Sequence, residues 1–139
     1  RLEKGYRSLG TDIHTNYNPY ESGLGFTVKL KKDDEFIGKN ALQKIKEKPI
    51  EKRLTCMIID DPEGMALGTE PIYSNGKAVG YVTSTNYGYF VDKHIVYGYL
   101  PTELSEKGNK LEVEYFGKRY PLTVTEEPLL DPENHRLKS

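Results

Sequence analysis

Three histidines and one cysteine are the side chains of this sequence that most readily bind a metal ion. His14, His94 and His135 lie far apart along the chain, and no cysteine or carboxylate cluster accompanies them. Zinc ligands usually come in closely spaced pairs, which is a pattern that these positions lack. We therefore expect no metal site.

The serines and the glycine-rich stretches carry no catalytic signature either. Ser74 and Ser84 have no nucleophile context, and "GYVTST" lacks the nucleophile-elbow pattern. The "GLG" at 23–25 is too short for a phosphate-binding loop and follows no predicted strand. The sequence thus predicts no catalytic residue and no self-contained active site.

Cys56 is the only cysteine, so the chain cannot form a disulfide within itself. It lies in the apolar run "RLTCMIID", where we expect a small buried thiol rather than a reactive one. A single unpaired cysteine favours a reducing compartment. We expect the cytoplasm, or the mitochondrial matrix if the source is eukaryotic.

Composition bounds the class of protein. The chain has 139 residues, a net charge of -1 and a mean hydropathy of -0.68, with no basic stripe. This balance argues against a nucleic-acid partner, and no run approaches the ~20 apolar residues of a membrane span. The 11 Tyr and 4 Phe argue against disorder and for a packed core.

The elements of the first part are predicted to be helical or irregular. Residues 1–9 carry helix formers with apolar side chains on one face, and residues 26–30 form a short β-prone stretch. Residues 37–49 predict a helix that starts with Asn40 as the N-cap and ends at Pro49.

From residue 51 onward the pattern changes to short strands with turns between them. Strands are expected at 52–60 and 94–100, and hairpins at 71–85, around Asn75-Gly76, and at 110–128, around Gly117-Lys118. The four tyrosines within 86–100 favour cross-strand packing over ligand stacking. The predicted fold class is therefore β-rich (α+β), with an antiparallel barrel or sandwich after a helical or irregular lead-in.

An ordered series of motifs goes further than composition. The series comprises "RLEKGYRSLGTDI", "NPYESGLGFTVKL", "FIGKNAL", "KRLTCMIIDD" and "EPIYSNGKAVGYVTSTNYGYFVDKHIVYGYLP". It resembles the C-terminal part of the aminomethyltransferase family. That family includes the glycine cleavage T-protein and the folate domains of sarcosine and dimethylglycine dehydrogenases and oxidases. The first and last motifs point to the dimethylglycine and sarcosine branch.

The resemblance implies a division of the chain. Residues 1–50 correspond to the end of a folate-binding region with a helical connector, 51–128 to a C-terminal β-barrel domain, and 129–139 to a tail. The catalytic aspartate and the FAD domain of the family would lie upstream. We therefore interpret the chain as a C-terminal fragment that is inactive alone.

The resemblance also implies a reaction for the parent protein. The parent would oxidatively remove a methyl group from an N-methylated glycine and pass the one-carbon unit to tetrahydrofolate. Holding both reactants in one site makes the capture effectively unimolecular. The alternatives are a fragment of the glycine cleavage aminomethyltransferase and a non-enzymatic regulatory relative.

Two residues inherit a cofactor-binding role from the resemblance. Arg1 matches a family arginine that reaches folate, where a guanidinium fork suits the glutamyl carboxylates. Glu21 matches a segment near the folate cleft and is the weaker candidate. Glu3 is expected to pair with a nearby basic residue, and no role is carried over to His135.

The fragment interpretation has a structural consequence. Residues 1–48 should pack less completely than the barrel, because their partners would lie upstream. We expect Leu2, Tyr6, Phe26 and Leu30 to be exposed or covered by another copy of the chain, so that self-association becomes possible.

Overall fold

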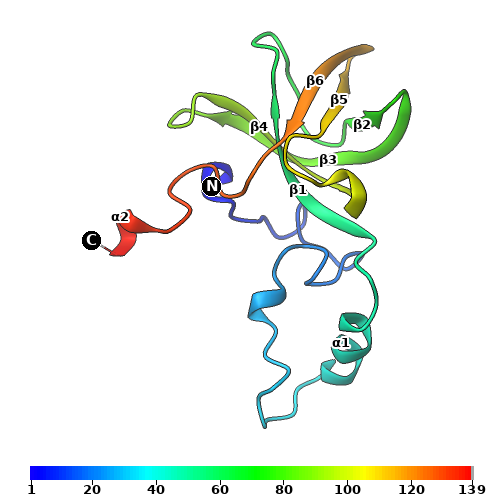
Figure 1. The fold of residues 1–139 in the computed structure, drawn as a ribbon, viewed down its shortest axis with the longest axis vertical. Helices are drawn as coiled ribbons and strands as arrows, with labels where there is room; N and C mark the ends of the chain where they lie inside the picture. Colours follow the sequence, from blue (N-terminus) through cyan, green and yellow to red (C-terminus); the bar gives the residue numbers. More distant parts are fainter. Residues whose placement is uncertain (139) are drawn as a thin grey trace.

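A computed structural model describes residues 1–138. Six antiparallel strands form a closed barrel in the order β1-β4-β3-β2-β5-β6 (Figure 1). The strands are β1 (Lys52–Ile59), β2 (Pro71–Ser74), β3 (Lys77–Gly88), β4 (Lys93–Pro101), β5 (Lys110–Tyr115) and β6 (Lys118–Val124). The predicted β-rich barrel is confirmed.

Two tight turns close the predicted hairpins. Asn75 and Gly76 join β2 to β3 with φ of 49° and 76°, and Phe116 and Gly117 join β5 to β6 with φ of 47° and 75°. Two consecutive positive φ values give the turn a twist that matches its flanking strands. Both turns therefore set the register of their hairpins.

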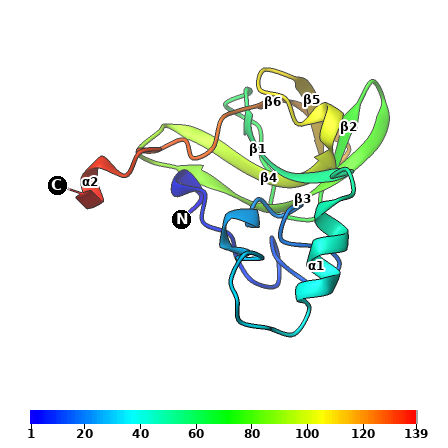
Figure 2. The same cartoon turned by 60° about the horizontal axis from the view of Figure 1, so that its bottom comes forward.

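The barrel wall is buried on two faces. One set of side chains fills the interior of the barrel, and it includes Met57, Val96 and Leu122. On β1 and β4 the alternate side chains point outward into a second cluster, which consists of Leu2, Leu54, Cys56, Ile95, Tyr97 and Tyr99. Figure 2 shows the segment before β1 lying against this outer side. The double burial explains why β1 is apolar at successive positions instead of alternating.

The N-terminal strap, defined here as residues 1–22, supplies the cover. It is mostly irregular, with one short 3-10 helix at Leu2–Lys4. The helix predicted over 1–9 is wrong. The 3-10 helix ends after three residues, because Gly5 follows it in the left-handed conformation with φ of 70°. Leu2 is buried in the outer cluster, so the expectation that it would be exposed is also wrong.

The remaining elements depart from the sequence predictions in detail. Residues 26–30 form no strand; a 3-10 helix occupies Gly25–Thr27. The predicted helix is present as α1 (Lys39–Lys46), but Gly38 stands at its N-cap, so Asn40 does not cap it. The tail ends in α2 (His135–Lys138).

The expected exposure holds for part of the lead-in. Tyr6 is 56% exposed and Phe26 74%, whereas Leu30 is half-buried. Within residues 1–138, no helix is long and apolar enough to cross a lipid bilayer.

Candidate functional site

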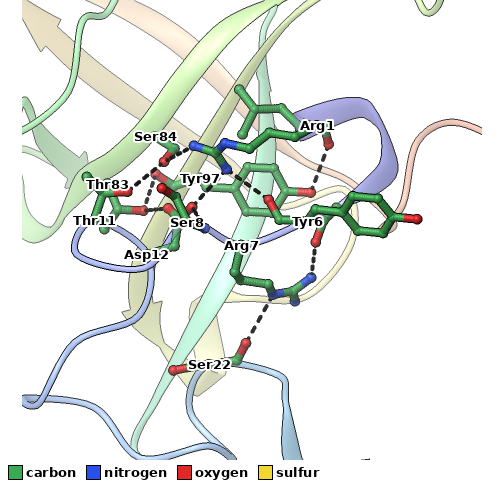
Figure 3. A network of polar contacts seen from close by, with 12 residues as sticks. Arg1, Tyr6, Arg7, Ser8, Thr11, Asp12, Ser22, Thr83, Ser84 and Tyr97 are labelled. Atoms are coloured by element: carbon green, nitrogen blue, oxygen red, sulfur yellow. Dashed lines mark hydrogen bonds and ion pairs between the residues drawn. The ribbon is translucent and has the colours of Figure 1, made fainter.

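Arg1 lies at the centre of a polar network between the strap and β3 (Figure 3). One terminal nitrogen, Nη1, donates to the carbonyl of Tyr6 at 2.8 Å and to Oδ2 of Asp12 at 3.0 Å. The other, Nη2, donates to Oγ of Ser84 at 2.8 Å. The guanidinium is thus held from three sides by groups far apart in the sequence.

Asp12 is the anionic partner in this network, and its side chain is 1% exposed. Oδ1 accepts from the hydroxyl of Thr83 at 2.6 Å, and Oδ2 accepts from the amide of Ser8 at 2.9 Å as well as from Arg1. A buried carboxylate is tolerated only with such partners. Sequence analysis missed Asp12, because its partners are brought to it by the fold.

A β-bulge lets consecutive residues of β3 join the network. The pairing of β3 with β4 shifts register between Val82 and Ser84. In a regular strand, Thr83 and Ser84 would point to opposite faces, but a bulge re-aims side chains. Both hydroxyls therefore reach the strap, with Thr83 binding Asp12 and Ser84 binding Arg1.

The guanidinium of Arg1 retains binding capacity. An arginine side chain has five N–H donors, and three of these have acceptors among the described residues. The side chain is 40% exposed and borders a polar cavity of about 170 Å³, which is also lined by Leu2, Glu3, Thr85, Asn86, Tyr87 and Gly88. Two parallel N–H donors suit a carboxylate, so the exposed part of this guanidinium has the chemistry to bind a small anionic group.

Glu3, which also borders this cavity, pairs with no basic residue within residues 1–138, so that prediction is wrong. Its Oε1 accepts from the backbone amides of Phe90 at 2.7 Å and Val91 at 3.2 Å. These amides lie in the turn between β3 and β4, where no ladder partner is available to them. Glu3 therefore anchors the strap to that turn.

Glu21 lies in a different cavity from Arg1. Its Oε2 accepts from the amide of Asn18 at 2.9 Å, and its carbonyl accepts from the amide of Leu54 at the start of β1. The cavity measures about 490 Å³ and is lined by Asn18, Tyr20, Glu21, Ile45, Lys46, Lys48, Pro49, Ile50 and Glu51. The two cavities share no lining residue, so the fold does not bring the two predicted ligands together.

A second ion pair ties the strap to residues 125–138, which follow β6. Arg7 pairs with Glu127 and also donates from Nε to the carbonyl of Ser22 at 3.1 Å. Burial raises the pKa of Glu127 above its ordinary value, although the Arg7 guanidinium opposes this shift. The pair was not foreseen, because its members are separated by most of the chain.

The remaining chemically active side chains have structural settings. Cys56 is 2% exposed, as predicted, and burial raises the pKa of its thiol. Nε2 of His94 lies 3.0 Å from the hydroxyl of Thr85, and burial lowers the pKa of this histidine. Across residues 1–138, no three His, Cys, Asp or Glu side chains are grouped so as to hold a metal ion. The geometry around Arg1 supports binding rather than proton transfer.

Comparison with known proteins places these features in a family. Residues 52–131 match the family model described as the glycine cleavage T-protein C-terminal barrel domain. The chain is 42% identical over 140 residues to human mitochondrial dimethylglycine dehydrogenase and 35% identical over 144 residues to mouse mitochondrial sarcosine dehydrogenase. Each alignment covers 99% of this chain but 16% of the relative.

Aminomethyltransferases are similar over nearly the same region. The enzyme of Prochlorococcus marinus (strain NATL1A) is 34% identical over 92% of this chain, which spans 34% of that protein. The crystal structure of glycine cleavage system aminomethyltransferase T from Bartonella henselae superimposes with a TM-score of 0.84 at 25% identity. That match covers 95% of this chain and 37% of the other.

Proposed function

The chain belongs to the glycine cleavage T-protein family through its C-terminal barrel domain, and from this premise we propose that it is the C-terminal part of a folate-dependent one-carbon enzyme. The proposed substrates of the whole enzyme are dimethylglycine or sarcosine. The similarity to dimethylglycine and sarcosine dehydrogenases over 99% of the chain supports this assignment. Because the chain spans 16% of these relatives, the demethylation step and FAD are assigned to the rest of the enzyme.

Within this proposal, residues 51–128 form the C-terminal domain and residues 1–50 complete the folate-binding region. Tetrahydrofolate supplies the nucleophilic nitrogen atoms that accept a one-carbon unit. This chain contributes binding and orientation rather than a reacting group. In a eukaryote we place the enzyme in the mitochondrial matrix, in line with its relatives named as mitochondrial, and otherwise in the cytoplasm.

Arg1 carries the proposal for the folate site. Its side chain borders a cavity of about 170 Å³, which is enough for a carboxylate but too small for a whole folate. We assign to it a carboxylate of the glutamyl tail. Glu21 is kept as a second candidate that would contact another part of the ligand, because its cavity is separate.

The test uses the full-length enzyme with dimethylglycine or sarcosine and tetrahydrofolate. We expect methylene-tetrahydrofolate as the product, and release of free formaldehyde when folate is omitted. Arg1→Ala should weaken folate binding by about tenfold or more, because it removes a charge-assisted carboxylate contact. Arg53→Ala, which removes an exposed arginine of β1, is the matched control. Equal folate affinity in both variants would contradict the assignment of Arg1.

A second candidate function is aminomethyl transfer in glycine cleavage. The TM-score of 0.84 to an aminomethyltransferase supports it. The same full-length protein, supplied with an aminomethyl-lipoyl carrier and tetrahydrofolate, distinguishes the two functions. Ammonia release without oxidation of dimethylglycine would favour this alternative, and activity in neither assay would favour a regulatory relative.

A further inference from the structure

We propose that Asp12 positions Arg1 and neutralises its charge, so that the free part of the guanidinium binds an anionic group through aligned hydrogen bonds rather than through long-range attraction. This inference rests on the proposed role of Arg1 in folate binding. It assigns to Asp12 the role of a positioning residue that does not itself contact the ligand.

The first step concerns how firmly Asp12 is fixed. Both of its carboxylate oxygens are engaged, Oδ1 by Thr83 and Oδ2 by Arg1 and the amide of Ser8. Its own carbonyl accepts from the hydroxyl of Tyr99 at 2.7 Å. Thr83 and Tyr99 belong to β3 and β4, so Asp12 is tied to the rigid barrel wall at both its side chain and its backbone.

The second step concerns which donors of Arg1 stay free. Nη1 uses both of its hydrogens, one for Tyr6 and one for Asp12, whereas Nη2 uses one of two for Ser84. Within residues 1–138, Nε–H and one hydrogen of Nη2 are therefore left without an acceptor. These nitrogens are bonded to the same carbon in one plane, and neighbouring guanidinium nitrogens can donate together to the oxygens of one anion.

The third step concerns charge. Asp12 and Arg1 lie 3.0 Å apart, so a distant anion meets a neutral pair rather than a bare cation. Long-range attraction then adds little, and salt has little to screen. Binding then depends on short-range hydrogen bonds from the guanidinium, which fit the oxygens of a carboxylate.

The positioning itself can be measured without ligand. Nitrogen-15 NMR on the 139-residue chain reports rotation of each guanidinium about its Nε–Cζ bond. We expect slow rotation for Arg1 and fast rotation for exposed Arg53. Asp12→Asn should accelerate the rotation of Arg1, whereas Asp33→Asn at an exposed site should not. Fast rotation of Arg1 in the wild type, or no change in Asp12→Asn, would overturn the proposal.

Binding is measured on the full-length enzyme with p-aminobenzoylglutamate at two salt concentrations. Asp12→Asn should weaken binding at the higher salt concentration by about fivefold or more, because the guanidinium is no longer held, and should steepen the salt dependence, because its charge is no longer compensated. An unchanged salt dependence together with altered NMR would refute the charge compensation. If Arg1→Ala leaves binding unaffected, the folate role of Arg1 fails, whereas the NMR result still reports whether Asp12 positions Arg1.

Discussion

Removing one hydroxyl group tests how the strap is held on the barrel. The side chain of Tyr99 is fully buried on the outer face of β4, where its ring stacks on Tyr17 with centroids 3.5 Å apart. Its hydroxyl donates to the carbonyl of Asp12 at 2.7 Å and lies 2.8 Å from Oγ of Ser22. Tyr99→Phe keeps the ring and deletes both contacts.

The expected loss of stability depends on which hydrogen-bond partners of the Tyr99 hydroxyl are left unpaired. Ser22 still has the carbonyl of Asn18 at 3.2 Å as an acceptor, so its hydroxyl can re-orient. The carbonyl of Asp12 has no such replacement among the described residues. One lost hydrogen bond with one buried acceptor left unpaired costs about 1–3 kcal/mol. We expect Tyr99→Phe to lower the free energy of unfolding by that amount.

Urea unfolding of the 139-residue chain provides the assay, with the slope of the transition checked for constancy. Tyr89→Phe is the matched control, because Tyr89 is 85% exposed and loses only a solvated hydroxyl. The control should change stability by less than about 0.5 kcal/mol. If Tyr99→Phe costs no more than Tyr89→Phe, the strap is not anchored through this hydroxyl.

Three further predictions concern charge, turns and ligand binding. Burial raises the pKa of Glu127 in the folded chain, so its contribution to stability is full below the ordinary pKa of glutamate and is lost as the pH rises from there through the raised pKa. When wild type and Glu127→Gln are unfolded between pH 4 and 7, this loss should be seen in the wild type and be missing from the variant. Gly76→Ala and Gly117→Ala should each cost about 1–2 kcal/mol by thermal or urea unfolding, because φ is positive at both positions; beyond the adjoining residues nothing lies within 4 Å of the new methyl group, so the cost is backbone strain and not a clash. No loss in either variant would show that these turns relax freely. The 139-residue chain alone should show no demethylase or aminomethyltransferase activity and should bind tetrahydrofolate poorly, because the cavity at Arg1 is too small for it; micromolar binding by calorimetry would contradict this.

The barrel could be predicted from the sequence, because the turn residues and strand patterns that indicate it are local. Asn75-Gly76 accepts the positive φ values that a two-residue hairpin needs, and the flanking strands follow at regular intervals. The structure of the residues before β1 could not be predicted in this way. Residues 26–30 have β-prone side chains, but all six barrel strands are already paired in a closed sheet, so no edge is left for them to join.

Only the resemblance pointed to candidate site residues, and it pointed to two of them, Arg1 and Glu21. The resemblance singles out Arg1 as a folate contact, which stays a prediction, and nothing in the sequence around Arg1 indicates Asp12 as its partner. The contacts that define the site join residues 83 positions apart, as between Arg1 and Ser84. Glu3 was misjudged for the same reason, since its partners are backbone amides of a distant turn and carry no side-chain signal.

The bulge in β3 explains how a barrel wall can serve both a core and a polar site. Val82 fills the interior, and the register shift that follows it turns Thr83 and Ser84 together toward the strap. A regular strand would send one of these hydroxyls into the apolar interior, where it would lack a partner. The bulge therefore avoids an unpaired buried hydroxyl and at the same time supplies Asp12 with a donor in Thr83 and Arg1 with an acceptor in Ser84. An extra residue in one strand thus converts a packing surface into the support for the guanidinium.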